Sequence, residues 1–242
     1  MRRAARPSRR AAGGRAAPGA PALVLALAAA LLVSCGGDPP EILGLEWRLE
    51  YRPMDQGPAG GAAYESLSVF ANVKDPDGPE DLEALWLVAD GAELSWTMDA
   101  SNWTRREEAG ETWFGAAALA MPDFGALPRG EYRVVAADLA GRRVERPFEL
   151  PREAGGGGPP YPLPRVTWKA GKVAVDSAWP ETLILAYDGA GALLRGVAAR
   201  AGDNELAALL GAEDAGRAAT LASYGYDPAR RIGAYSWKTE KR

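Results

Sequence analysis

A glycine- and proline-rich segment is the feature that most constrains how this chain can fold. Residues 151–164 read PREAGGGGPPYPLP, with four consecutive glycines followed by closely spaced prolines. Such a run cannot continue a strand or a helix, because glycine adds flexibility and proline removes a backbone donor. A phosphate-binding glycine loop would need a P-loop lysine or a dinucleotide pattern, and the segment has neither. We therefore expect a linker at 151–164, between a domain at 41–150 and a smaller one at 165–242.

The first of these segments has the pattern of β-structure along its whole length. Apolar and polar residues alternate from 43 to 51, as in a strand with one solvated face. Residues 82–89 are apolar on both faces, which is typical of a central strand, and the turn at 75–78 precedes them. Further candidate strands lie at 67–73, 94–98, 113–119, 131–137 and 142–150. About seven short strands in roughly 110 residues indicate a β-sandwich.

Two stretches of this segment resemble bacterial immunoglobulin-like and fibronectin-type modules. Residues 73–91, VKDPDGPEDLEALWLVADG, are similar to the early strands of such modules. Residues 130–150, GEYRVVAADLAGRRVERPFEL, look like their closing hairpin, in which Gly-x-Tyr opens a strand and an Asp-x-x-Gly turn follows it. The resemblance implies an Ig-like β-sandwich without the inter-sheet cysteine pair. It implies no activity, because such sandwiches serve many functions.

The second segment, 165–242, predicts a small, mainly-β domain with one short helix, so that the expected fold class is all-β. Alternating residues at 166–168 and 173–175 are followed by a hairpin of 182–187 and 192–199. Asp203 is placed to cap a short helix whose inner face would carry Leu206, Leu209 and Leu210, and Gly211 would end it. Two last strands, 219–226 and 231–237, flank a turn.

The N-terminal residues have the order of an export signal. Residues 1–20 contain six arginines and no acidic residue, and an apolar run from 22 to 33 follows them. Small residues then flank Cys35. A basic region, an apolar region and a processing site in this order are typical of a secretory signal. The apolar run is shorter than the about 20 residues that a membrane-spanning helix needs.

The residues Leu32-Val33-Ser34-Cys35 resemble the lipobox of bacterial lipoproteins. In that family the cysteine thiol receives a diacylglyceryl group, a peptidase cuts just before the cysteine, and the freed amine is often acylated. The resemblance implies a signal peptide at 1–34, a lipid such as palmitate on Cys35, and a tether at 35–40. It also implies a lipid-anchored, extracytoplasmic protein of the bacterial cell envelope. Cys35 is the chain's one cysteine, so lipidation uses a thiol that would otherwise be unpaired.

Charge and composition exclude several classes of function. The whole chain has 28 Lys and Arg against 32 Asp and Glu. Removal of 1–34 takes away six arginines and no acidic residue, which leaves 22 basic against 32 acidic residues and a net charge of about −10. A chain this acidic is not expected to bind nucleic acid. The sequence contains no histidine, which excludes Ser-His-Asp and Cys-His sites. We expect no catalytic residue and no cofactor beyond the covalent lipid.

Four acidic residues are crowded into one turn: Asp75, Asp77, Glu80 and Asp81. Carboxylates at this density could bind Ca²⁺. However, Pro76 and Gly78 already account for the turn, and the spacing does not match an EF-hand loop. We expect an ordinary turn with solvated acids and no metal, and we keep calcium as the alternative.

One tryptophan is a candidate contact residue. Trp103 lies in a polar stretch, 99–111, where no apolar period would bury it. Trp96 and Trp113 lie in strand patterns, which predict core positions for them. Exposed tryptophan is common where proteins contact partners.

Together these features predict a lipid-anchored envelope protein that presents two β-rich modules for binding or assembly. Its partner would be an envelope protein or a glycan. The alternative is an envelope lipoprotein enzyme, or its accessory subunit, that acts on cell-wall polysaccharide through a pair of carboxylates. Two acids that face a cleft would favour this alternative.

Overall fold

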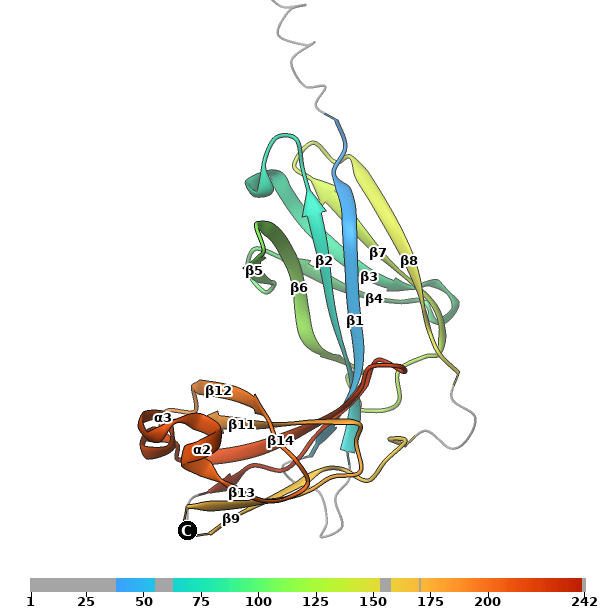
Figure 1. Cartoon of the computed structure of the whole chain (residues 1–242). Coiled ribbons are helices and arrows are strands. Elements are labelled where there is room, and N and C mark those ends of the chain that lie inside the picture. Colours follow the sequence, from blue (N-terminus) through green and yellow to red (C-terminus); the bar gives the residue numbers. More distant parts are fainter. Residues whose placement is uncertain (1–37, 55–62, 153–157, 170, 241–242) are drawn as a thin grey trace, which may run out of the picture. The chain divides into compact units, whose positions relative to one another are not determined.

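The computed structural model describes residues 38–54, 63–152, 158–169 and 171–240 (Figure 1). These residues form strands and two short α-helices, which confirms the predicted all-β class. Residues 38–242 cluster as one compact unit.

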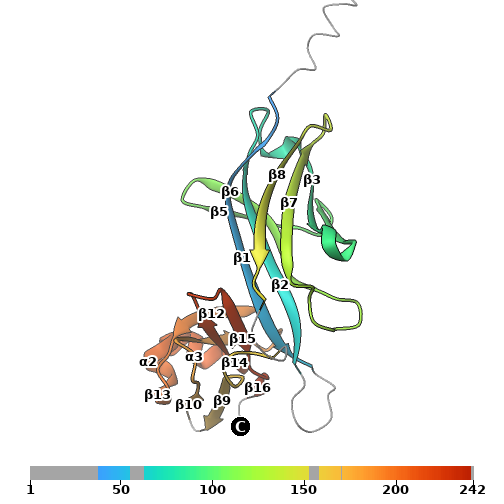
Figure 2. The ribbon, with the colours of Figure 1, turned by 90° about the vertical axis from the view of Figure 1, so that its right-hand side faces the viewer.

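The strands of the first segment form two sheets (Figures 1 and 2). In one, the order is β1-β2-β6-β5, and in the other it is β4-β3-β7-β8. The strands are β1 (Glu41–Pro53), β2 (Ala63–Lys74), β3 (Leu82–Ala89), β4 (Leu94–Asp99), β5 (Thr104–Glu108), β6 (Glu111–Ala120), β7 (Gly130–Asp138) and β8 (Arg143–Leu150). The predicted central position of 82–89 is confirmed, because β3 lies between β4 and β7.

The C-terminal residues add more strands and both α-helices. A small separate sheet has the order β13-β10-β9. The elements are β9 (Arg165–Lys169), β10 (Lys172–Asp176), β11 (Glu181–Tyr187), β12 (Leu193–Ala198), β13 (Gly202–Glu205), α2 (Leu206–Leu210), α3 (Ala212–Arg217), β14 (Thr220–Asp227), β15 (Ile232–Tyr235) and β16 (Thr239–Glu240).

A single nine-stranded sheet crosses the expected domain boundary. Its order is β12-β11-β14-β15-β1-β2-β6-β5, and β16 pairs with β14. The joining contact is parallel pairing of β1 with β15, in which Leu49 is opposite Ile232 and Tyr51 is opposite Ala234. Because β1 has 13 residues, it can pair with β2 along its length and still meet β15 near its C-terminal end. The division into domains at 41–150 and 165–242 stays a prediction.

The expected linker is packed where the structure describes it. Tyr161 and Leu163 lie against the core of the first eight strands. The Trp179 indole Nε1 donates to the Pro162 carbonyl at 2.9 Å, and the Tyr161 hydroxyl donates to Asp227 at 3.3 Å. Residues 153–157, which include three of the four glycines, lie outside the described residues.

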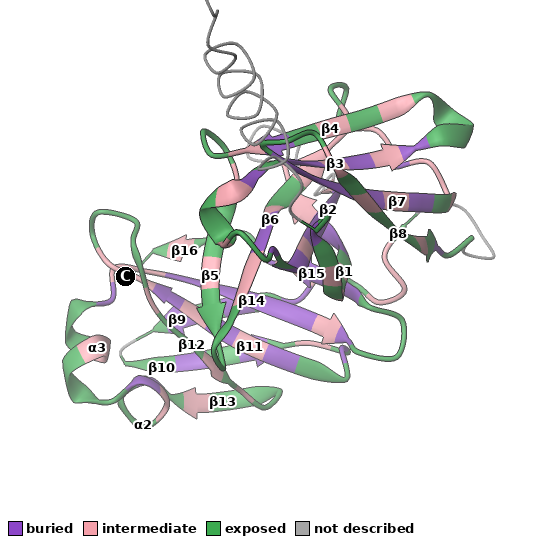
Figure 3. Ribbon diagram, turned by 90° about the horizontal axis from the view of Figure 1, so that it is seen from above, coloured by how far each residue is buried: buried purple, intermediate pink, exposed green. Residues whose placement is uncertain are grey.

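The described residues form two hydrophobic cores. The larger one includes Leu49, Leu67, Leu85 and Val134, which come from both sheets of the first segment. The smaller one is built around Trp168 and Ile184, and α2 closes it. Figure 3 shows that β7 and β14 are buried along much of their length, whereas β5 is largely exposed.

The helical region differs from the sequence-based expectation. Asp203 does not cap a helix, because it lies in β13. The first helical N–H, from Leu206, donates instead to the backbone carbonyl of Gly171 at 3.0 Å, so tertiary contact replaces the predicted side-chain cap. Leu206 and Leu210 are buried as expected, and Gly211 ends α2 with φ +83°. A second helix, α3, was not expected.

Gly225 on β14 provides a test of the packing around Trp179. A Cβ at residue 225 would come within 2.2 Å of Trp179 Cγ, whereas a Cβ at Gly216 would meet nothing within 4 Å. Gly225→Ala should displace the indole and lower the free energy of unfolding by about 1–3 kcal/mol, measured by thermal denaturation. Gly216→Ala in α3 should leave stability unchanged or raise it by up to about 1 kcal/mol. Equal melting temperatures for the two variants would contradict this packing.

Candidate functional site

The register of the nine-stranded sheet places charged and aromatic side chains on one face. Residues paired across neighbouring strands point to the same side of a sheet. Glu50 of β1 is paired with Gly233 of β15, and Tyr226 of β14 is paired with the same glycine. Charged and aromatic side chains found in this way lie opposite both cores and form what we call the arginine–aromatic face: Glu46, Arg48, Glu50, Arg52, Phe70, Lys74, Arg106, Glu108, Glu111, Trp113, Glu181, Tyr187, Tyr224, Tyr226 and Tyr235.

Cations lie over the partly exposed rings of this face. From the charged group to the ring centroid, the distances are 4.3 Å for Arg106 and Phe70, 5.2 Å for Arg48 and Tyr226, 4.4 Å for Arg52 and Tyr235, and 4.5 Å for Lys238 and Tyr187. Cation–π contacts of this kind hold the long side chains flat against the sheet. The face therefore combines aromatic surface with three arginines, of which Arg52 and Arg106 also form ion pairs with Glu50 and Glu46.

A buried carboxylate lies at the centre of the face. Glu50 is 4% exposed, and its oxygens accept hydrogen bonds from Arg52 Nη2 at 2.7 Å and Ser68 Oγ at 3.0 Å. The hydroxyl of Tyr235 lies 3.3 Å from Glu50 Oε1 and that of Tyr224 lies 3.5 Å from it. Burial and the nearby Glu50 carboxylate raise the pKa of both phenols above the ordinary value. They therefore stay neutral donors, and the network supports the strand junction.

The sequence pattern indicated only part of this face. The alternation along β1 predicted that Arg48, Glu50 and Arg52 share one polar side. It could not show that Tyr224 and Tyr235 would be beside Glu50, because they lie about 180 residues away in the chain and meet β1 only through the β1–β15 pairing.

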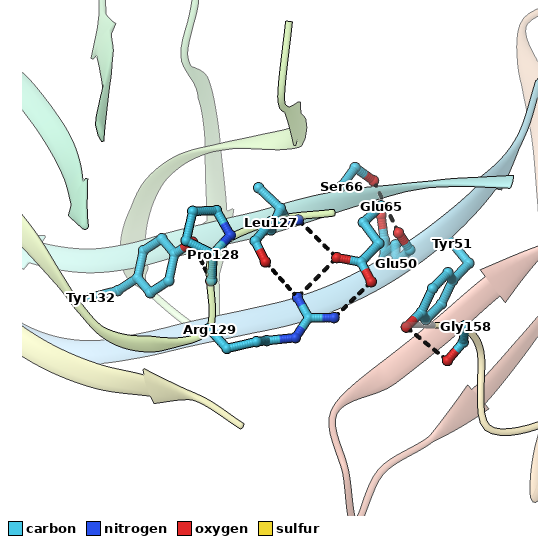
Figure 4. A network of polar contacts seen from close by, with 9 residues as sticks. All are labelled: Glu50, Tyr51, Glu65, Ser66, Leu127, Pro128, Arg129, Tyr132 and Gly158. Atoms are coloured by element: carbon cyan, nitrogen blue, oxygen red, sulfur yellow. Dashed lines mark hydrogen bonds and ion pairs between the residues drawn. The ribbon is translucent and has the colours of Figure 1, made fainter. Parts of the chain in front are cut away.

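A second buried ion pair fixes the loop before β7 (Figure 4). The Arg129 guanidinium donates to Glu65 Oε1 at 2.6 Å and to Oε2 at 2.8 Å, and the Leu127 amide donates to Oε2 at 2.9 Å. The Tyr51 hydroxyl donates to the Gly158 carbonyl at 3.1 Å nearby. Both oxygens of Glu65 therefore accept hydrogen bonds from the protein itself. The pair holds the loop before β7 against β2.

Removal of one partner tests this pair. Arg129→Met should lower the free energy of unfolding by about 3–5 kcal/mol, because the Glu65 carboxylate, 4% exposed, would keep a buried charge without its cation. Urea unfolding is the measurement. Arg133→Met is the matched control, because Arg133 pairs with exposed Asp90 and Glu145 and should cost less than about 1 kcal/mol. The double variant Glu65→Gln/Arg129→Met should recover part of the loss. A loss at Arg129 no larger than at Arg133 would refute the assignment.

Three of the four acids of the turn come together. Ligand-type oxygens of Asp75, Asp77 and Asp81 all lie within 4.8 Å of one another. The turn that holds them is closed by the Gly78 amide, which donates to the Asp75 carbonyl at 3.1 Å, and Gly78 has φ +104°. Glu80 lies elsewhere and forms an ion pair with Arg105. We call the three aspartates, together with Asp138, the acidic corner.

Asp138 and Arg142 join the acidic corner from the β7–β8 turn. Asp138 is fully buried, and its carboxylate accepts from Arg142 Nε at 2.6 Å and from the Arg142 amide at 2.8 Å. These bonds lower the pKa of Asp138 although burial alone would raise it. Desolvation and the charges of the neighbouring aspartates raise the pKa of Asp81. The corner therefore holds more negative charge than its one arginine balances.

Trp103 is only half-buried and packs against the larger core. Its ring centroid lies 4.9 Å from that of Phe114. The polar stretch around it contains β5, which the sequence did not predict. Trp96 packs against the core as expected, but Trp113 lies on the opposite face of β6 from Phe114, so its predicted core position is wrong. Residues 113–119 are apolar at both parities, and periodicity could not select a face. A contact role for Trp103 stays a prediction.

The predicted lipidation site, Cys35, lies outside the described residues. Among the residues that the structure describes, no helix has the length and apolar character required to cross a membrane. The structure begins at Asp38, three residues after Cys35, and β1 starts at Glu41.

One hollow lies next to the expected linker. Its volume is about 620 Å³, and the described residues that line it are Trp47, Pro151, Arg152, Gly158, Pro159, Pro160, Ala229, Arg230, Arg231 and Ile232. No carboxylate is among these residues. The described residues that line this hollow therefore include no pair of carboxylates of the kind that glycoside hydrolysis needs.

Comparison with known proteins gives no family. No family model and no curated protein matches the chain. Among solved structures, the chain is similar to Tp47, the 47-kilodalton lipoprotein of Treponema pallidum, with 12% identity and a TM-score of 0.42, over 82% of this chain and 50% of that one. It is also similar to dimeric latent PorU from Porphyromonas gingivalis, with 15% identity and a TM-score of 0.35, over 86% of this chain and 20% of that one.

The chain thus spans half the length of the first of these structures and a fifth of the second. TM-scores this low do not establish a shared fold.

Proposed function

We propose that this chain is a lipid-anchored, extracytoplasmic protein of the bacterial cell envelope that binds an envelope partner without catalysing a reaction. The observation that carries the anchor is the order of basic, apolar and lipobox-like residues that ends at Cys35, the one cysteine of the chain. A lipid on Cys35 would hold the body close to the membrane, because only two residues, Gly36 and Gly37, separate Cys35 from the first described residue. No cofactor beyond this lipid is proposed.

The first eight strands are proposed to be an Ig-like module. Immunoglobulin-type sandwiches pair their strands in the order A-B-E-D in one sheet and C-F-G, with an added C′, in the other. The orders β1-β2-β6-β5 and β4-β3-β7-β8 correspond to this scheme. Tyr132, near the start of β7, donates its hydroxyl to the Pro128 carbonyl at 2.8 Å, as in the tyrosine corner of such modules. Burial raises the pKa of Tyr132 to about 12, so the hydroxyl stays a donor.

The arginine–aromatic face is proposed as the binding surface. Partly exposed rings such as Tyr226 and Phe70 can stack on sugars or on apolar side chains, and they lie beside Arg48 and Arg106. Arg52 and Arg106 are paired with Glu50 and Glu46 of the same face, whereas Arg48 enters none of the described ion pairs. Arg48 is therefore the arginine proposed to bind an acidic group of the partner. An acidic envelope glycan satisfies both features, and an acidic envelope protein is the other candidate.

The anchor is tested by substitution of its cysteine. Cys35→Ala should abolish lipidation and leave an unprocessed precursor, because the chain has no other thiol. The measurement is incorporation of a clickable palmitate in the bacterium, followed by membrane fractionation. Ser34→Ala is the control, because it preserves the thiol and a small residue before it. Labelled Cys35→Ala protein would refute the lipoprotein assignment.

The binding surface is tested with a variant that removes one exposed cation. Arg48→Gln should weaken binding of an acidic polysaccharide, such as polygalacturonate, by roughly tenfold, or about 1.4 kcal/mol. Isothermal titration of detergent-solubilised protein gives the affinity, with neutral dextran as the reference polymer.

Arg165→Gln is the matched control, because Arg165 is exposed on β9, in the other C-terminal sheet. It should bind like the wild type. Equal loss in both variants would mean that only net charge matters, and no binding of either polymer would exclude an acidic glycan. Capture of an acidic envelope protein that Arg48→Gln weakens would keep the face and change the partner.

A further inference from the structure

We propose that Asp75, Asp77 and Asp81 of the acidic corner form a Ca²⁺ site. The sequence alone favoured an ordinary solvated turn at 75–81. The structure adds two observations that the sequence did not contain: a buried carboxylate oxygen without a hydrogen-bond partner, and the approach of three aspartate carboxylates to within 4.8 Å of one another. This inference is independent of the proposed function.

The buried oxygen belongs to Asp75. Asp75 is 9% exposed, and its Oδ2 has no hydrogen-bond partner. Oδ1 accepts from the Asp77 amide at 2.8 Å, so it is Oδ2 that lacks a donor. A buried carboxylate oxygen without a donor or a cation is costly. A bound metal ion would remove that cost.

The spacing of the carboxylates fits a Ca²⁺ ion. Calcium binds oxygen ligands at about 2.3–2.6 Å, so two oxygens on one ion lie no more than about 5 Å apart. The oxygens of Asp75, Asp77 and Asp81 lie within 4.8 Å of one another. Asp75 is buried, Asp81 is intermediate and Asp77 is exposed, so one side of the site is open to the water molecules that would complete six to eight ligands.

Arg142 does not take the place of the cation. Its Nε and amide bind Asp138, its Nη2 lies 3.3 Å from Asp77 Oδ2, and it is 4.0 Å from Asp81 Oδ2. Among the described ion pairs, none reaches Asp75. One guanidinium therefore pairs with Asp77, Asp81 and Asp138 but not with Asp75, and its single charge leaves the negative charge of the four carboxylates largely unbalanced.

The test is the melting temperature of the detergent-solubilised full chain in 10 mM CaCl₂ and in EDTA. Extracellular-type sites have dissociation constants of about 0.1–1 mM, and a ligand that binds only the folded state stabilises it by mass action. For a chain of this size the expected upward shift is roughly 3–10 °C. Isothermal titration with CaCl₂ should give one ion per chain.

Asp75→Asn removes the charge and keeps the acceptor for the Asp77 amide. This variant should melt in EDTA at or above the wild-type temperature, because it removes a buried unpaired charge, and it should lose the calcium shift. Asp188→Asn is the matched control. The Asp188 carboxylate likewise accepts backbone amides, from Ala190 and Ala192 at 2.9 Å, in the β11–β12 turn. It should keep the full calcium shift.

Two results would overturn the proposal. One is a wild-type melting temperature that does not respond to calcium, and another is an equal response in Asp75→Asn. Loss of lipid labelling or of glycan binding would not affect any of these readings, so failure of the proposed function is distinguishable.

Discussion

The rest of the structure depends on the backbone pairing of β1 with β2 on one side and with β15 on the other. The antiparallel β1–β2 ladder runs from residue 41 to 53, and the parallel contact with β15 uses residues 49–51. A short parallel contact is weak by itself. It is reinforced by the Leu49 amide, which donates to the Arg231 carbonyl at 3.0 Å, and by the Glu50 network, which connects β1, β2, β14 and β15.

Buried charge is handled in one way at most places in this protein. Glu50 and Glu65 each have an arginine partner and further donors. Asp138 is likewise held by Arg142. Pairing of this kind offsets the cost of removing a carboxylate from water. Asp75 differs from these residues, because one of its carboxylate oxygens has no hydrogen-bond partner.

Sheet continuity also decides where an exposed binding surface can form. Trp113 and Phe70 come from strands of the first segment, and Tyr187 and Tyr226 come from the C-terminal strands. These rings share one face only because β1 and β15 belong to the same sheet. The Ig-like module proposed for the first eight strands would present only part of this face by itself. Binding would thus require the chain on both sides of residues 151–164.

The sequence by itself determined the all-β class, most strand positions and the pairing of neighbouring strands, because alternation and turn residues act over a few positions. The strands at 82–89, 131–137 and 142–150 are examples. The tertiary structure decided the rest. The β1–β15 pairing, the hydrogen bond from the Leu206 amide to Gly171 at the start of α2, and the ion pair of Arg142 with Asp77 all join residues far apart in the chain. No local sequence pattern predicts such contacts, because which residues come together depends on how distant segments pack in the folded molecule.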